Sequence, residues 1–200
     1  NHFAVDDGRR WTHLRLNIFP DGGVARLRVH GVARPDFTAF VRGGGELDLA
    51  AMENGGWVEI CSDMFYGHRQ NLILPGRSLF MGDGWETQRR RGPGHDWTIV
   101  RLAAPGTVHR VELDTDHFKG NAPETCWLDG LHAPGLGAAE LVESVRWRPI
   151  LRECALQPHA RHRWEELEDA GPVTHVRLSI APDGGAARLR VFGTLEEPER

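Results

Sequence analysis

The sequence predicts an all-β protein, an antiparallel β-sandwich or barrel of the jelly-roll type with short helices. Segments in which apolar and polar residues alternate, a pattern typical of half-buried strands, recur along the chain. Stretches rich in glycine and proline separate these segments, and helical periodicity is confined to short pieces near residues 47–53 and 164–169. Many short strands joined by turns indicate a sandwich or barrel.

A duplicated segment begins close to the first residue. Residues 11–31 (WTHLRLNIFPDGGVARLRVHG) and 173–193 (VTHVRLSIAPDGGAARLRVFG) align without gaps at an offset of 162 and are identical at 15 of 21 positions. This offset is too long for a solenoid unit and indicates a duplicated domain. We expect residues 1–33 to be the C-terminal hairpin of a preceding, mostly missing repeat. Residues 34–46, with a proline and three consecutive glycines, are expected to be a linker, and residues 47–200 a complete β-sandwich repeat.

Both copies of the duplicated segment predict a β-hairpin with one apolar face. In the first copy, apolar residues alternate with polar ones on both sides of a turn at residues 20–23. An isolated hairpin is marginal in water, so we expect this one to pack on the following repeat, on another chain or on a separate polypeptide. Its apolar face consists of Leu14, Leu16, Ile18, Leu27 and Val29. Further strands are expected at residues 57–61, 97–102, 107–114, 126–128 and 141–147.

Composition excludes several classes of partner. The 24 basic and 28 acidic side chains give a net charge of −4, which argues against binding to nucleic acid or an anionic membrane. The sequence contains neither an apolar run of about 18 residues nor a signal pattern. Three widely separated cysteines predict neither a disulfide framework nor a zinc site. We therefore expect a cytoplasmic protein, and we also expect a homo-oligomer.

Two segments dense in ionisable groups interrupt the strands. Residues 75–96 form a loop longer than plain connections usually are, and its apolar residues predict that it is ordered and functional. Residues 114–121 (DTDHFKGN) follow a predicted strand and include Lys119, the single lysine among 24 basic residues. If both loops leave the same end of the sandwich, they form one mouth suited to a small polar anion.

Several motifs together resemble the allantoicase family. They are Asn71-Leu72 with Pro75-Gly76-Arg77, then GDGWETQRRR, GHDW, DTDHFKGN and the closing THVRLSIAPDGGAARLRVFG. The resemblance covers residues 47–193, and residues 11–31 resemble the end of that family's other repeat. It implies two jelly-roll repeats similar to galactose-binding domains. It also implies the hydrolysis of allantoate to ureidoglycolate and urea in purine (allantoin) degradation, an amidinohydrolase reaction.

The implied reaction requires recognisable groups. The substrate carboxylate needs a cation, and arginine offers a forked donor. Urea is a poor leaving group without a proton, so a general acid is required, and a second group must activate water or remove a proton from the remaining ureido group. His117 or His95 could be the acid and Asp96 or Glu86 the base, while a divalent metal, manganese in this family, could instead polarise the water. The catalytic candidates are Glu86, His95, Asp96 and His117, and the substrate-binding candidates are Arg89, Arg91, Lys119, Asn121 and Asp114.

Other interpretations of the same residues remain open. The sandwich fold is common among small-molecule and carbohydrate-binding modules that catalyse nothing, and the chain could also be an inactive repeat kept for assembly. Consecutive arginines at 89–91 are often solvated, and Asp96, just before a strand, could bond backbone amides. Acidic and imidazole groups in the two loops favour the enzyme, because sugar-binding faces depend more on aromatic side chains.

Overall fold

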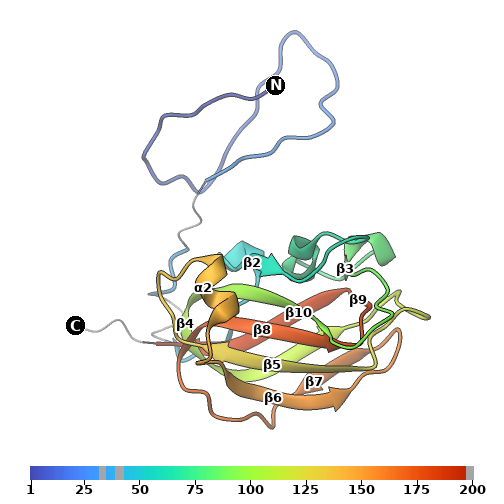
Figure 1. The fold of residues 1–200 in the computed structure, drawn as a ribbon. Helices are drawn as coiled ribbons and strands as arrows, with labels where there is room; N and C mark the ends of the chain where they lie inside the picture. The colour runs from blue at the N-terminus through green and yellow to red at the C-terminus, as the bar shows by residue number, and fades with distance from the viewer. Residues whose placement is uncertain (32–34, 39–42, 197–200) are drawn as a thin grey trace. The chain divides into compact units, whose positions relative to one another are not determined.

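The computed structural model describes residues 1–31, 35–38 and 43–196 (Figure 1), and the chain divides into two compact units, Asn1–Val32 and Ala33–Arg200. The second unit is almost entirely β-structure, as the sequence predicts. Its strands are β1 (Leu47–Asp48), β2 (Trp57–Cys61), β3 (Trp85–Glu86), β4 (Asp96–Asp114), β5 (Thr125–Leu131), β6 (Arg148–Ala155), β7 (Arg161–Trp164), β8 (Val173–Ala181), β9 (Gly185–Ala186) and β10 (Arg188–Leu195). Its described helices are η1 (Met52–Asn54), η2 (Arg69–Ile73), η3 (Met81–Asp83) and α2 (Ala138–Glu143).

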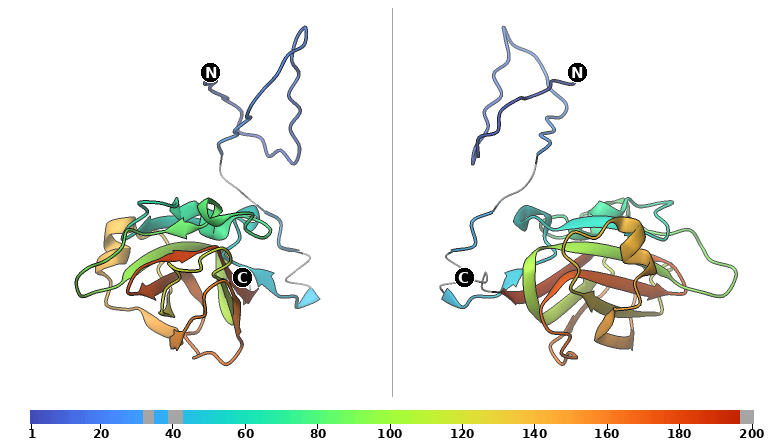
Figure 2. Two further views of the ribbon diagram at one scale, coloured as in Figure 1. Left: turned by 90° about the vertical axis from the view of Figure 1, so that its right-hand side faces the viewer. Right: turned by 60° about the vertical axis from the view of Figure 1, so that its left-hand side comes forward.

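The long strand β4 belongs to both layers of the sandwich. Residues 96–101 of β4 pair with β2 on one side and β8 on the other, whereas residues 106–114 pair with β10 and β7. Beyond β8 the sheet continues with β5 and then β6, and beyond β10 it continues with β1. Every pairing is antiparallel. Strands β3 and β9 form a separate two-stranded sheet. Figure 2 shows the green β4 lying beside the red C-terminal strands in both views.

Alternation along the strands produces the core. In β10, Leu189 and Val191 are fully buried, while the alternating Arg188 and Arg190 face the other side of the sheet. The same period operates in β4 and β8, so apolar side chains from both layers meet inside the sandwich. The main cluster includes Val58, Val100, Val111, Leu113, Leu128, Val176, Leu178, Ile180, Leu189 and Val191.

The hairpin prediction for the duplicated segment is wrong. In the second copy, β8 and β10 do not pair with each other, because β4 lies between them and pairs with both. In the first copy, residues 1–31 contain no strand. A turn and alternating residues look alike in a hairpin and in two strands that flank a third one, so the pattern alone could not separate these arrangements.

Equivalent apolar residues differ sharply in exposure between the two copies. Leu14, Leu16, Ile18, Leu27 and Val29 are 44–63% exposed. Their counterparts at offset 162 are at most 1% exposed. The counterparts are Val176, Leu178, Ile180, Leu189 and Val191.

Other predictions are corrected locally. Residues 141–147, expected as a strand, contain the end of α2, and residues 164–169, expected as helical, contain only the end of β7. The predicted strands 97–102 and 107–114 merge into β4. The linker expected at 34–46 lies partly outside the described residues. Within the described parts of the chain, no helix is long and apolar enough to cross a membrane.

Candidate active site

The two loops at residues 75–96 and 114–121 contact each other, as they must if they share one end of the sandwich. The Asn121 Nδ2 atom donates a hydrogen bond to Glu86 Oε1 at 2.6 Å. The His117 Nε2 atom lies 3.1 Å from the Ser78 carbonyl oxygen. A third link is the ion pair between Arg77 and Asp116. Residues 75–96 and 114–121 therefore form one continuous structure.

Phe118 anchors this structure. Its ring is fully buried and lies against Gly84 and Gly185, which belong to the segments around β3 and β9. A Cβ atom placed on Gly185 would lie 2.0 Å from Phe118 Cε1, and one on Gly84 would lie 2.8 Å from Cε2. Glycine is therefore required at both positions, because a larger residue would displace the ring that fixes His117 and Lys119 beside it.

His117 and His159 form a pair with unusual backbone geometry. Their φ angles are 71° and 51°, in the left-handed region that residues other than glycine rarely adopt. The His117 backbone N–H donates to His159 Nδ1 at 2.8 Å, and Asp116 Oδ1 lies 3.4 Å from the same nitrogen. Partial burial raises the pKa of Asp116, but the hydrogen bond and charge of Arg77 outweigh it, and the pKa lies below its ordinary value.

The partners of the two imidazoles determine their tautomers. A carbonyl can only accept, so neutral His117 carries its proton on Nε2, facing Ser78, and its Nδ1 is the basic atom. His159 accepts at Nδ1, so its neutral form carries the proton on Nε2. His117 is thus presented with one defined nitrogen available for proton exchange.

His95 and Asp96 lie in different surroundings from Glu86 and His117. The His95 ring packs on Trp127 with 4.6 Å between centroids and lines a hollow of about 220 Å³ with Trp97 and Arg177. Partial burial, together with the charge of Arg177, lowers the pKa of His95.

Asp96 is 1% exposed, and its Oδ1 atom has two partners. It accepts a hydrogen bond from Ser62 Oγ at 2.9 Å and forms an ion pair with Arg90. These contacts join the beginning of β4 to the residues before and after it, as expected of a carboxylate with a structural function.

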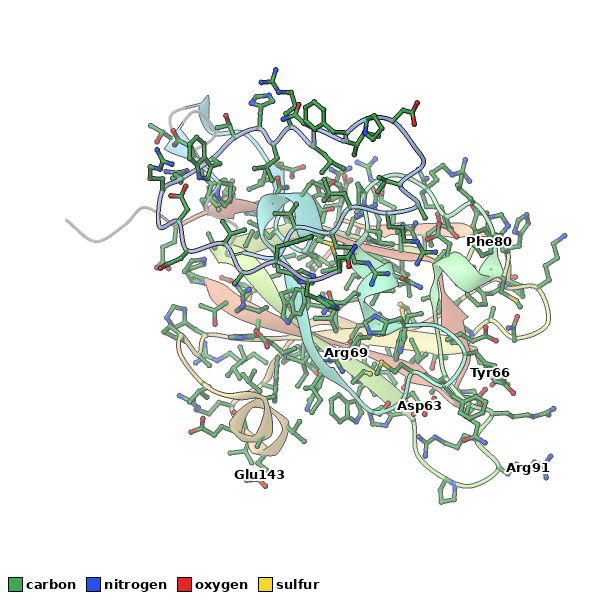
Figure 3. All side chains as sticks on the ribbon, turned by 90° about the horizontal axis from the view of Figure 1, so that it is seen from above. Asp63, Tyr66, Arg69, Phe80, Arg91 and Glu143 are labelled. Carbon is green, nitrogen blue, oxygen red and sulfur yellow. The ribbon has the colours of Figure 1, made fainter. Side chains whose placement is uncertain are left out.

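The substrate-binding candidates also differ in their surroundings. Arg89, Arg91 and Lys119 are exposed, and Figure 3 shows Arg91 pointing outward at the periphery. Asn121 is held by Glu86, as described above. Asp114 is 4% exposed and accepts the Asp116 backbone N–H at 2.8 Å.

A polar cavity of about 270 Å³ lies over β10, β4 and β7, and Asp114 is the one sequence candidate in its lining. Sequence reasoning missed Arg188 and Arg190, although the motif ARLRV in both copies of the duplicated segment could have pointed to them. The lining consists of Glu53, Gly76, Arg77, Glu112, Asp114, Arg161, Arg188, Arg190 and Phe192, which we call the arginine cavity.

The described residues do not bring together the side chains that would bind a metal ion. Among the described residues, no three histidine, cysteine, aspartate or glutamate side chains are arranged to hold a metal ion. The residues present therefore do not fit the manganese considered from the sequence, and no catalytic step is derived through it.

Known proteins resemble this chain closely. The sequence profile described as "Allantoicase repeat" matches residues 1–34 and 47–196. A protein of Pseudomonas aeruginosa (strain UCBPP-PA14) named "Probable allantoicase" is 50% identical over 200 residues, covering 99% of this chain and 60% of that protein. "Allantoicase" of Dictyostelium discoideum is 49% identical, covering 98% of this chain and 53% of that protein. The chain thus spans little more than half the length of these relatives.

Solved structures agree with the fold and the sequence match. The crystal structure of allantoicase from Saccharomyces cerevisiae superposes with a TM-score of 0.65 at 35% identity, over 74% of this chain and 43% of that one. The C-terminal domain of a chitobiase from Bacteroides fragilis superposes with a TM-score of 0.55 at 12% identity, which supports the fold alone. The profile match over both units and the yeast structure lead to one conclusion: this chain is a member of the allantoicase family.

Proposed function

We propose that the chain is part of a hydrolase that converts allantoate and water into ureidoglycolate and urea. The observation that carries the proposal is the 50% identity, over 99% of this chain, with a protein named probable allantoicase. The contact between the two loops supports it, because it gathers a carboxylate, an imidazole, an amide and cations at one end of the sandwich.

The chemistry is a proton transfer at each end of the bond that breaks. We assign removal of a proton from the retained ureido N–H to Glu86, whose carboxylate is held by Asn121. The nitrogen lone pair then forms a C=N bond while the bond to the other ureido nitrogen breaks. His117, protonated on Nδ1, donates its proton to that nitrogen, and urea leaves. Water adds to the C=N carbon, and the protons return to give ureidoglycolate.

The remaining candidates bind the substrate or are alternatives to the two proton-transfer groups. Ureido groups form hydrogen bonds with Asp114, which accepts, and with Asn121, which can accept or donate. The substrate anion is attracted toward the mouth of the site by Arg89, Arg91 and Lys119. His95 is the alternative acid, although its lowered pKa disfavours the protonated form that a general acid needs near pH 7. Asp96 is the alternative base, although its burial, its hydrogen bond from Ser62 and its ion pair with Arg90 favour a structural function.

Urea release from allantoate tests the proposal. We expect it from the 200-residue chain or from that chain joined to a preceding repeat, and we expect Glu86→Gln and His117→Gln to lower the rate by about 10²–10⁴-fold. Glu143→Gln, in the exposed face of α2, is the matched control and leaves the rate unchanged. Absence of urea release from both proteins would refute the function, and binding of chitosan oligosaccharides without urea release would support a carbohydrate-binding module.

We also propose that residues 1–33 are the end of a second repeat and that the protein is a cytoplasmic homo-oligomer. The exposed apolar residues of the first copy support an assembly that covers them. Three free cysteines support a reducing compartment, since Cys126 Sγ and Cys154 Sγ lie 3.8 Å apart without a bond. The mass in solution, measured by light scattering, tests the oligomer, and a monomer would refute it.

A further inference from the structure

The sheet face under the arginine cavity carries charges in cross-strand rows. Arg188 on β10 stands opposite Asp114 on β4, which in turn stands opposite Arg161 on β7. In the next row, Arg190 stands opposite Glu112. Because neighbouring strands place such residues about 5 Å apart, each carboxylate has arginines beside it.

The two arginines of β10 build the wall of the cavity. Arg188 donates through Nη1 to the carbonyl oxygens of Asn71, at 3.1 Å, and Asp83, and through Nη2 to the Asp83 carboxylate at 2.9 Å. Arg190 donates through Nη2 to the carbonyl oxygens of Leu74 at 2.6 Å and Gly76 at 2.8 Å. These bonds hold residues 71–83 over the sheet, so the cavity has a fixed shape before any ligand arrives.

The remaining two arginines of the cavity stay accessible. The side chains of Arg77 and Arg161 are 67% and 51% exposed. Arg161 Nε lies 3.9 Å from Asp114 Oδ2, too far for a hydrogen bond, and Arg77 pairs with Asp116 at the edge of the lining. Arg161 can therefore turn toward an anion freely, and Arg77 can do so by sharing or leaving its ion pair with Asp116; neither movement breaks the wall.

The mixed charge of the lining selects a particular ligand chemistry. Four arginines and three carboxylates line the cavity, an excess of one positive charge. A simple anion would be repelled by the carboxylates, whereas a ureido acid offers a carboxylate for arginine and N–H groups for Asp114 and Glu112. The volume of about 270 Å³ lies near the lower end of ligand pockets, which suits a small molecule.

The duplicated segment provides independent support. Arg26 and Arg28 occupy the positions of Arg188 and Arg190 at the offset of 162, within the same ARLRV motif. The outward position that follows differs, His30 in the first copy and Phe192 in the second. Both copies thus retain the arginines that build the wall.

We propose that the arginine cavity is the subsite that binds the carboxylate and one ureido group of the substrate. Arg77 and Arg161 donate to the carboxylate, and Asp114 and Glu112 accept the ureido N–H groups. This inference rests on the proposed function, and it assigns recognition of the carboxylate to Arg77 and Arg161 in place of Arg89 and Arg91.

Binding of N-carbamoylglycine, the simplest ureido acid, tests the subsite with the whole 200-residue chain. Isothermal titration or chemical-shift perturbation gives its Kd for the native chain and for Arg77→Gln and Arg161→Gln. We expect each substitution to weaken binding at least tenfold, and the amide of the probe, which lacks the carboxylate, to bind equally weakly to all forms. Arg152→Gln is the matched control, because Arg152 is 78% exposed and pairs with Glu168 on another surface. Thermal melting verifies that each variant folds.

The outcomes separate the subsite from the function. Unchanged Kd values in both variants, or tight binding of phosphate in preference to the probe, overturn the subsite. The subsite is also overturned if the native chain does not bind the probe at millimolar concentration and 50-fold molar excess over the protein. A Kd in the millimolar range is roughly the weakest affinity class of small ligands. The proposed function is judged apart from these results by urea release, so a chain that releases urea while the arginine variants bind normally keeps the function and loses the subsite.

Discussion

Replacement of Phe118 is expected to loosen the candidate site and lower the stability of the whole second unit. Its ring is fully buried, and a Phe→Ala change at such a position costs about 3–5 kcal/mol. With a denaturant dependence of about 2 kcal/mol per molar urea, the midpoint of unfolding falls by about 2 M. Urea denaturation followed by tryptophan fluorescence measures the change.

A double-mutant cycle with Gly185 tests the structural reason. Gly185→Ala alone puts its Cβ atom 2.0 Å from the Phe118 ring, and such overpacking costs about 1–3 kcal/mol. In the Phe118→Ala background the obstacle is absent, so the same substitution is expected to cost less than about 0.5 kcal/mol. Gly120→Ala is the control, since nothing lies within 4 Å of its Cβ position.

Additive costs would refute this reasoning. If Gly185→Ala destabilised both backgrounds equally, the glycine would be required by the backbone alone and not by the ring. If Phe118→Ala changed the midpoint by less than about 0.5 M, the packing of the two loops would contribute little to the stability of the unit.

Three further substitutions test other parts of the structure. Asp96→Ala is expected to cost about 3 kcal/mol in urea denaturation, because it leaves the partners of a buried carboxylate unpaired, and normal stability with lost urea release would instead support the catalytic base. Burial lowers the pKa of His175 to about 4, so the neutral form stabilises the fold above pH 6.5 and this contribution is lost toward pH 4. Lowering the pH from 7 to 5 should cost about 2 kcal/mol through His175, and His175→Gln should remove that part of the pH dependence; an unchanged dependence would contradict it. Leu178→Ala is expected to cost about 2–5 kcal/mol and the equivalent Leu16→Ala less than about 0.5 kcal/mol, and similar costs would show that the first copy is packed as well.

The sequence predicts the fold class because the core depends on a simple period. Apolar residues alternate with polar ones at Leu189 and Val191 in β10, and at Leu178 and Ile180 in β8. This alternation identifies the strands and their buried faces. It could not reveal which strands are neighbours, because hydrogen bonds between backbones leave no trace in side-chain periodicity. The hairpin expected for residues 173–193 is therefore two strands separated by β4.

The candidate site was predictable only in part. The density of ionisable groups, and the length of the first loop, indicated residues 75–96 and 114–121. The contact between the two loops depends on Phe118, and an apolar residue in a polar loop is a sign that its side chain is buried. No pattern in the sequence could place Arg161 or Arg188 beside Asp114, since this neighbourhood arises from the register of three strands distant in the chain. The pairing of His117 with His159 is likewise a tertiary contact.

The position of β4 between two later strands constrains how the protein can be made. During synthesis, β4 leaves the ribosome long before β8 and β10. The backbone groups of β4 that pair with these two strands therefore stay unpaired until the later strands are translated. Unpaired strand edges of this kind invite pairing with the wrong chain. Nascent molecules of this repeat are thus most vulnerable to aggregation just before residues 173–195 emerge, and a chaperone that binds extended apolar strands would act on them at that stage.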